Sequence, residues 1–173
     1  MDSFTQMTQD WAGFFSALAQ VSGGLVGLVF VALTFNAKTV GVNGDPMLSA
    51  LARQTFSDFL ILLLVSLVML TPHTTAASVG AIFLALSLVD TLRILRNLLR
   101  LRRHLRGPAG GWKITGRFVL SAIAHAMLAG VGVDLLLGNP HPDLSGSLLF
   151  SGVVSLLLSG CRSAWLLVVQ KED

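Results

Sequence analysis

Five long apolar stretches constrain the fold of this chain more than any other feature of its sequence. They lie at about residues 13–36, 54–71, 76–93, 115–138 and 146–169. The hydrocarbon core of a bilayer is about 30 Å thick, and a helix needs about 20 mostly apolar residues to cross it. Because each stretch reaches or approaches that length, we predict an all-α integral membrane bundle of five transmembrane helices, which forms a single domain over residues 1–173.

The composition and the connectors agree with a membrane protein. Hydrophobic residues make up 53% of the chain and charged residues only 12%, whereas about 25% of the residues in soluble domains are charged. The connectors are short and carry turn residues, such as Asn43-Gly44 and Asp45-Pro46 before the second stretch. The single cysteine excludes an internal disulfide and fits no zinc motif.

The basic residues predict how the chain is oriented, because cytoplasmic loops of membrane proteins carry an excess of Lys and Arg. With five spans, all twelve Lys and Arg fall on one side, in the segments 37–53 and 93–117 and at the C-terminal end. The N-terminus and the connectors 71–75 and 138–145 contain none. The sequence therefore predicts an N-terminus outside and a cytoplasmic C-terminus. Because the N-terminus lacks positive charge, we expect the first helix to be retained rather than cleaved.

An arginine-rich segment, RILRNLLRLRRHLR at 93–106, follows the third stretch. We expect it either to continue the third helix beyond the membrane or to lie on the inner leaflet, up to Gly107-Pro108. The candidate residues for lipid or partner binding are Arg93, Arg96, Arg100, Arg103 and Arg106. They suit anionic lipids of the inner leaflet, at about 1 kcal/mol for each residue near the surface, or a cytoplasmic protein partner. Nucleic acid is not expected, because no aromatic residues alternate with these arginines.

Ionisable residues occur inside the apolar stretches, where they are costly and usually functional. At 1.5 Å per residue, Asp58, Asp90 and Arg162 share a layer nearer the inner face. An Asp58–Arg162 or an Asp90–Arg162 ion pair would allow the charges to be buried, and Arg93 competes as a partner of Asp90. The layer is either a structural ion pair or a gate or ion-binding layer.

A histidine, His125, lies near the middle of the fourth stretch, and the sequence leaves it isolated from the acids. Two interpretations fit it. It is either a neutral imidazole that is hydrogen-bonded to a facing helix, or a residue that relays protons or senses pH.

Serine recurs every four residues in the last stretch, at positions 147, 151, 155, 159 and 163. Since a helix has 3.6 residues per turn, the row drifts by ~40° per step and spreads over an arc that also holds Arg162. The row is either a packing seam or the lining of a pore. The candidate pore or gate residues are Ser151, Ser155, Ser159, Arg162, Asp90 and Asp58. Gly23, Gly27 and Gly130 lie in stripes of small residues, which predict helix packing.

The leading functional hypothesis is a homo-oligomeric inner-membrane protein that forms an ion or small-solute pathway. Five helices are few for a transporter with inverted repeats, so a channel would be built by association of several copies. The competing hypothesis is a non-transporting scaffold or regulator that binds a partner through residues 93–106. An enzyme is not expected, because the sequence has no Ser/His/Asp set, no HExxH and no Gly-rich phosphate loop. No cofactor or metal is expected either.

The first apolar stretch, WAGFFSALAQVSGGLVGLVFVALTFN at 11–36, has a pattern of W-x-x-F-F followed by L-x-G-L-x-F-V-A-L-x-x-N. The residues that match are Trp11, Phe14, Phe15, Leu25, Gly27, Leu28, Phe30, Val31, Ala32, Leu33 and Asn36. In this segment the chain resembles a group of small bacterial polytopic membrane proteins of unassigned function. The resemblance implies a multi-pass protein of the bacterial inner (cytoplasmic) membrane.

Overall fold

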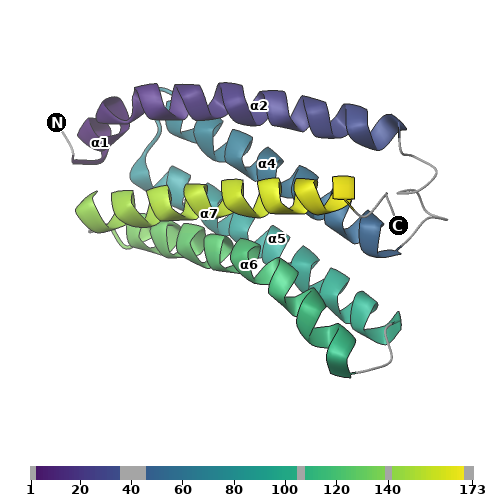
Figure 1. The fold of residues 1–173 in the computed structure, drawn as a ribbon. Helices are drawn as coiled ribbons and strands as arrows, with labels where there is room; N and C mark the ends of the chain where they lie inside the picture. The colour runs from purple at the N-terminus through teal and green to yellow at the C-terminus, as the bar shows by residue number, and fades with distance from the viewer. Residues whose placement is uncertain (1–2, 36–45, 105–107, 139–141, 170–173) are drawn as a thin grey trace.

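The structure is a computed structural model that describes residues 3–35, 46–104, 108–138 and 142–169 (Figure 1). Its helices are α1 (Ser3–Asp10), α2 (Ala12–Phe35), α4 (Pro46–Leu70), α5 (Ala76–His104), α6 (Pro108–Leu136) and α7 (Pro142–Val169). No strand occurs in these ranges, and five of the helices, all except α1, are long and apolar enough to cross a membrane. The prediction of an all-α chain with five candidate membrane spans is confirmed.

Several helix boundaries differ from those expected. The helices α4 and α6 begin at Pro46 and Pro108, before the expected starts at 54 and 115. Proline suits the first turn of a helix because its fixed φ matches the helix and its missing N–H would have had no partner there. The helix α5 is continuous to His104, so the arginine-rich segment does continue the third helix. The short helix α1 was not expected from the sequence.

The turn between α4 and α5 has its own local stabilisation. His73 adopts a positive φ of 59°, which closes the turn. Thr75 and Ser78 then cap the start of α5. The backbone N–H of Ser78 donates to Thr75 Oγ1 and the backbone N–H of Thr75 donates to Ser78 Oγ, each over 3.2 Å. This reciprocal arrangement satisfies donors that the first turn of a helix leaves without intrahelical partners.

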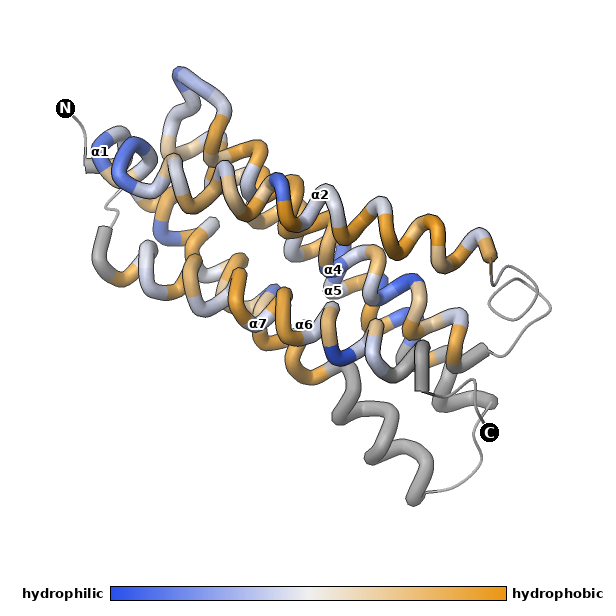
Figure 2. The backbone as a smooth tube through the Cα atoms, turned by 45° about the horizontal axis from the view of Figure 1, so that its top comes forward, coloured by the Kyte–Doolittle hydropathy of each residue, from blue (hydrophilic) through white to orange (hydrophobic). Residues whose placement is uncertain are grey.

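Successive long helices run antiparallel, and four of them form a closed group (Figure 1). The helix α4 packs on α5 and α7, and α6 packs on the other sides of α5 and α7. The helix α2 lies outside this group and packs mainly on α4. Only Phe15, Leu18 and Ser22 of α2 are buried, although the helix is apolar along most of its length (Figure 2). An apolar surface of this kind is suited to lipid.

Two glycines allow α5 and α6 to approach closely. A Cβ added to Gly80 would lie 2.7 Å from the carbonyl oxygen of Gly132, and a Cβ added to Gly132 would lie 2.9 Å from that of Gly80. On α7, a Cβ added to Gly160 would lie 2.6 Å from the ring of Phe59 on α4. Residues larger than glycine therefore do not fit at these helix crossings.

The prediction that Gly23, Gly27 and Gly130 serve helix packing stays a prediction. A Cβ added to Gly23 or Gly130 would be in ordinary van der Waals contact with a leucine of a neighbouring helix, at 3.8 and 4.0 Å, and no other described segment comes within 4 Å of one added to Gly27. The sequence shows where small residues recur but not which face of a helix meets a neighbour. The crossings too close for a larger residue use Gly80, Gly132 and Gly160.

Candidate functional site

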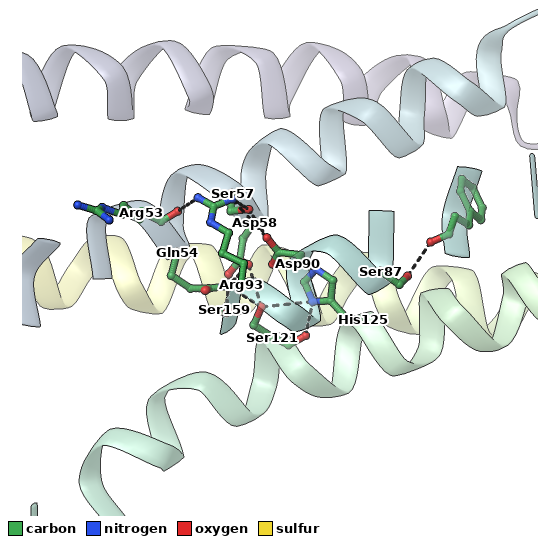
Figure 3. Close-up of polar contacts among 11 residues, drawn as sticks. Arg53, Gln54, Ser57, Asp58, Ser87, Asp90, Arg93, Ser121, His125 and Ser159 are labelled. Atoms are coloured by element: carbon green, nitrogen blue, oxygen red, sulfur yellow. Dashed lines mark hydrogen bonds and ion pairs between the residues drawn. The ribbon is translucent and has the colours of Figure 1, made fainter. Parts of the chain in front are cut away.

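Four helices contribute to one polar cluster in the interior of the bundle (Figure 3). We define the polar cluster as Gln54, Ser57 and Asp58 of α4, Asp90 and Arg93 of α5, Ser121 and His125 of α6, and Ser159 of α7. All of these residues except Arg93 are buried. On α4, Ser57 and Asp58 lie three and four residues after Gln54, and the members on α5 and on α6 are three and four residues apart. These spacings place side chains on the same side of a helix.

The polar cluster lies close to a group of arginines that mark one end of the bundle. Each of these arginines is three to six residues from Asp58, Asp90 or Ser159 on its own helix. At 1.5 Å per residue, this separation is about 5–9 Å towards this end. We call it the basic end, because Arg53, Arg93, Arg96 and Arg162 lie towards it along their helices.

The carboxylate of Asp58 accepts three hydrogen bonds. Gln54 Nε2 donates to Oδ1 over 2.7 Å, and Ser121 Oγ donates to the same oxygen over 2.9 Å. Ser159 Oγ donates to Oδ2 over 2.7 Å. A buried carboxylate is tolerated when such donors replace water, so Asp58 ties α4 to α6 and α7.

Asp90 is held from α4 and from its own helix. Ser57 Oγ donates to its Oδ1 over 2.6 Å, and Nη1 of Arg93 lies 3.4 Å from the same oxygen. The guanidinium of Arg93 also donates to Ser57 Oγ over 2.7 Å and to the carbonyl oxygen of Arg53 over 3.2 Å. Because the Arg93 side chain is 38% exposed, it connects the buried acid to the surface at the basic end.

His125 faces a different partner with each ring nitrogen. Its Nδ1 lies 2.6 Å from the carbonyl oxygen of Ser121. Its Nε2 lies 3.1 Å from Asp90 Oδ2, and the two side chains are 0% and 4% exposed. The Nε2–Oδ2 contact is not aligned as a hydrogen bond, and neither atom hydrogen-bonds to any other described residue. The contact is therefore chiefly electrostatic.

Ser121 connects the two acids. Its hydroxyl donates to Asp58 and also accepts from Gln54 Nε2 over 2.8 Å, while its carbonyl oxygen contacts His125. A continuous series of polar contacts therefore runs from Asp58 through Ser121 and His125 to Asp90, and on to Ser57 and Arg93 (Figure 3).

The expected ion pairs of Arg162 with Asp58 or Asp90 are wrong. Arg162 is exposed and forms no ion pair within the described residues. On α7 it lies three positions beyond Ser159, about 60° around the helix, and it is Ser159 that meets Asp58. The competing prediction, an Asp90–Arg93 pair, is confirmed.

The structure also revises the position of His125. The two acids do share one layer, as the helix rise predicted, but His125 belongs to the same layer and contacts Asp90 directly. The isolation expected from the sequence is therefore wrong. The error arose because the partner of His125 lies on α5, 35 residues away in the sequence, and no local pattern reports such a contact.

The serines of α7 do not share one face. Ser151 is exposed, Ser155 is half-buried and Ser159 is buried. The drift of a four-residue spacing around a 3.6-residue helix carries the row from the outside of the bundle to its inside. Within one chain, only Ser159 of the three belongs to the polar cluster.

The arginine-rich segment lies mainly on the extension of α5. Arg96 is exposed, and Arg93 belongs to the polar cluster. Arg100 and Arg103 lie within the helix, whereas Arg106 is outside the described residues.

Three members of the polar cluster, Gln54, Ser57 and Ser121, were not expected from the sequence. The place of Gln54 could have been predicted from its spacing to Asp58, since residues four apart meet on a helix surface. The partners of Ser57 come from α5, 33 and 36 residues away, and no local pattern reports contacts of that kind.

In the described ranges, no three His, Cys, Asp or Glu side chains gather as metal ligands would. No family model, curated protein or solved structure matches this chain. The resemblance of residues 11–36 to small bacterial membrane proteins therefore stays a prediction.

Proposed function

We propose that this chain is a multi-pass membrane protein that provides a pathway for an ion, and that the polar cluster is its ion-binding layer. One observation supports this most strongly: two carboxylates, an imidazole and a guanidinium meet where four candidate membrane-spanning helices converge. Ionisable groups at such depth are costly, and in membrane proteins they commonly mark ion and proton pathways.

The pathway is gated rather than permanently open. On the side of the cluster away from the basic end, each helix carries large apolar residues in the core. These residues are Leu62 and Val65 on α4, Val79 and Phe83 on α5, Leu128 and Val131 on α6, and Leu149 and Val153 on α7. An ion that reaches the cluster from the basic end crosses this apolar layer only if the helices rearrange.

The orientation and the assembly complete the proposal. We place the basic end at the cytoplasmic face of a bacterial inner membrane, because Lys and Arg favour that side, and its arginines face the anionic lipids there. We propose association of copies through α2, whose exposed face offers Gly24 and Gly27, where no other described segment comes within 4 Å of an added Cβ. Small residues at such a face allow membrane helices to approach closely.

The test is ion flux through purified protein in liposomes, together with electrical recording in planar bilayers. We expect flux in the unmodified protein and its loss when Asp58 and Asp90 are both replaced by Asn. Arg162→Gln is the matched control, because this charge lies outside the cluster. A change of ion selectivity in Arg162→Gln would place the pathway between copies, lined by the exposed side of α7. No flux of any ion would refute the proposal.

A second function is favoured by one observation. The helix α5 continues to His104, fourteen residues beyond Asp90, and Arg96 on it is exposed. A rigid basic helix of this kind suits a scaffold or regulator that binds a cytoplasmic partner. In that case the protein conducts no ion, and replacing Arg96, Arg100 and Arg103 with Gln removes partner binding without loss of membrane insertion.

A further inference from the structure

We infer that the ion is a proton, and that the Nε2 atom of His125 and the Oδ2 atom of Asp90 hold it between them. The inference begins with the tautomer of the imidazole. A carbonyl oxygen is only an acceptor, so the 2.6 Å contact between His125 Nδ1 and the Ser121 carbonyl requires the proton to be on Nδ1. The Ser121 hydroxyl offers no alternative, because its hydrogen is donated to Asp58.

The fixed tautomer leaves Nε2 without a proton whenever the imidazole is neutral. Nε2 then carries no proton and lies 3.1 Å from Asp90 Oδ2, which as a carboxylate is also an acceptor. A proton shared by these two atoms requires the ring to turn from its present orientation, in which they form no hydrogen bond. Two acceptors at this distance in a buried site repel each other. One added proton removes the conflict. It forms an N–H bond on Nε2 or an O–H bond on Oδ2, and no other reactant is needed.

The charges around the Asp90–His125 pair also indicate that the pair binds one proton. The helix α4 contributes Asp58, α5 contributes Asp90 and Arg93, and α6 contributes His125. The helix α7 contributes only the hydroxyl of Ser159, since the charge of Arg162 is exposed. With both acids ionised, Arg93 balances one of them, and a proton on the Asp90–His125 pair balances the other. With both acids ionised, the cluster is neutral when one proton is bound to this pair.

A metal cation fits this site poorly. Arg93 places a positive charge 3.4 Å from Asp90 Oδ1, and the groups around Asp58 all donate hydrogen bonds to it. Hard cations need six or more oxygen ligands, and the described residues provide no set of three acidic, histidine or cysteine ligands. A proton needs only the two facing atoms.

The site itself can be tested without transport. The experiment uses ¹⁵N and ¹³C solid-state NMR of the full chain in lipid bilayers, with His73, His104 and His141 changed to Gln so that His125 is the sole histidine. We expect Nδ1 to stay protonated across the pH series, and a pH-dependent proton to bridge Nε2 and the Asp90 carboxyl. A neutral imidazole with the proton on Nε2 and a bare Nδ1 would overturn the inference, and this test alters neither partner.

The matched variant is Asp90→Asn, whose amide can donate to Nε2. We expect it to keep the Nδ1–H tautomer and to lose the pH-dependent proton of the pair. If the same pH-dependent proton persisted on Nε2 in this variant, Asp90 would not be its partner, and the inference would be overturned.

The role of the proton in transport rests on the proposed function, and liposomes that contain a pH-sensitive dye separate the two. Proton flux that is lost in Asp90→Asn and in His125→Gln supports both. Flux of another ion without protons would retain the pathway and overturn its assignment to protons. If no ion crosses but NMR shows the bridging proton, the proposed function is refuted and the proton-binding site stands.

Discussion

Ser159→Ala tests whether the polar cluster stabilises the bundle. The substitution removes one of the three donors to Asp58, a buried bond of 2.7 Å that joins α7 to α4. Hydrogen bonds to charged groups contribute about 1.5–3 kcal/mol in general. Measured interhelical bonds in membranes average about 0.6 kcal/mol and reach about 1.7 kcal/mol, because the unfolded chain finds other partners in the membrane. We therefore expect a loss of about 1–2 kcal/mol in the free energy of unfolding.

The assay is equilibrium unfolding in mixed micelles with a rising fraction of sodium dodecyl sulfate, followed by tryptophan fluorescence. Ser151→Ala is the matched control, because this serine is exposed on the same helix two turns earlier. Substitutions at such positions usually change stability by no more than about 0.5 kcal/mol. The contrast therefore compares two chemically identical changes that differ only in which side of α7 they occupy.

A double-mutant cycle with Asp58→Asn sharpens the test. If Ser159 acts through the carboxylate of Asp58, its replacement costs less once that charge has been removed. Equal losses in Ser159→Ala and Ser151→Ala, or full additivity with Asp58→Asn, would refute the reasoning.

The same unfolding assay checks two further predictions. Gly80→Ala is expected to cost about 1–3 kcal/mol, because its Cβ would lie 2.7 Å from the Gly132 carbonyl oxygen. Gly13→Ala is the control, at an exposed position of α2 that no other described segment approaches within 4 Å. It should be neutral or stabilising by up to about 1 kcal/mol through helix propensity. Equal effects would contradict the close crossing of α5 and α6. Arg93→Gln should destabilise the fold more than Arg162→Gln, since only Arg93 pairs with a buried acid; the opposite order would refute the assignment of that ion pair.

Much of the fold could be predicted from the sequence. The length of the apolar stretches determines how many helices can cross a bilayer, and the structure contains five such helices. The prolines that begin α4, α6 and α7 bound these helices through backbone chemistry that is local. The shared layer of Asp58 and Asp90 along their helices was also predictable, because the rise per residue of a helix is constant.

The partners in the candidate site were less predictable. Of the expected contacts, Asp90–Arg93 is local, three residues apart on one helix, and it was among the alternatives. The contacts of His125 with Asp90 and of Ser159 with Asp58 join different helices. The sequence placed Arg162 where the structure has Ser159, because both lie at a similar depth and depth alone does not separate them.

The sequence by itself therefore determined the apolar character of the long helices, their number among the described residues, and the layer that Asp58 and Asp90 share. The tertiary structure alone decided which ionisable groups meet. The physical reason is that a membrane-spanning helix is apolar around most of its circumference, so its pattern does not reveal which face turns inward. That choice is made by packing, as at Gly80 against Gly132 and Gly160 against Phe59, which sets the rotation of each helix and brings His125 to Asp90.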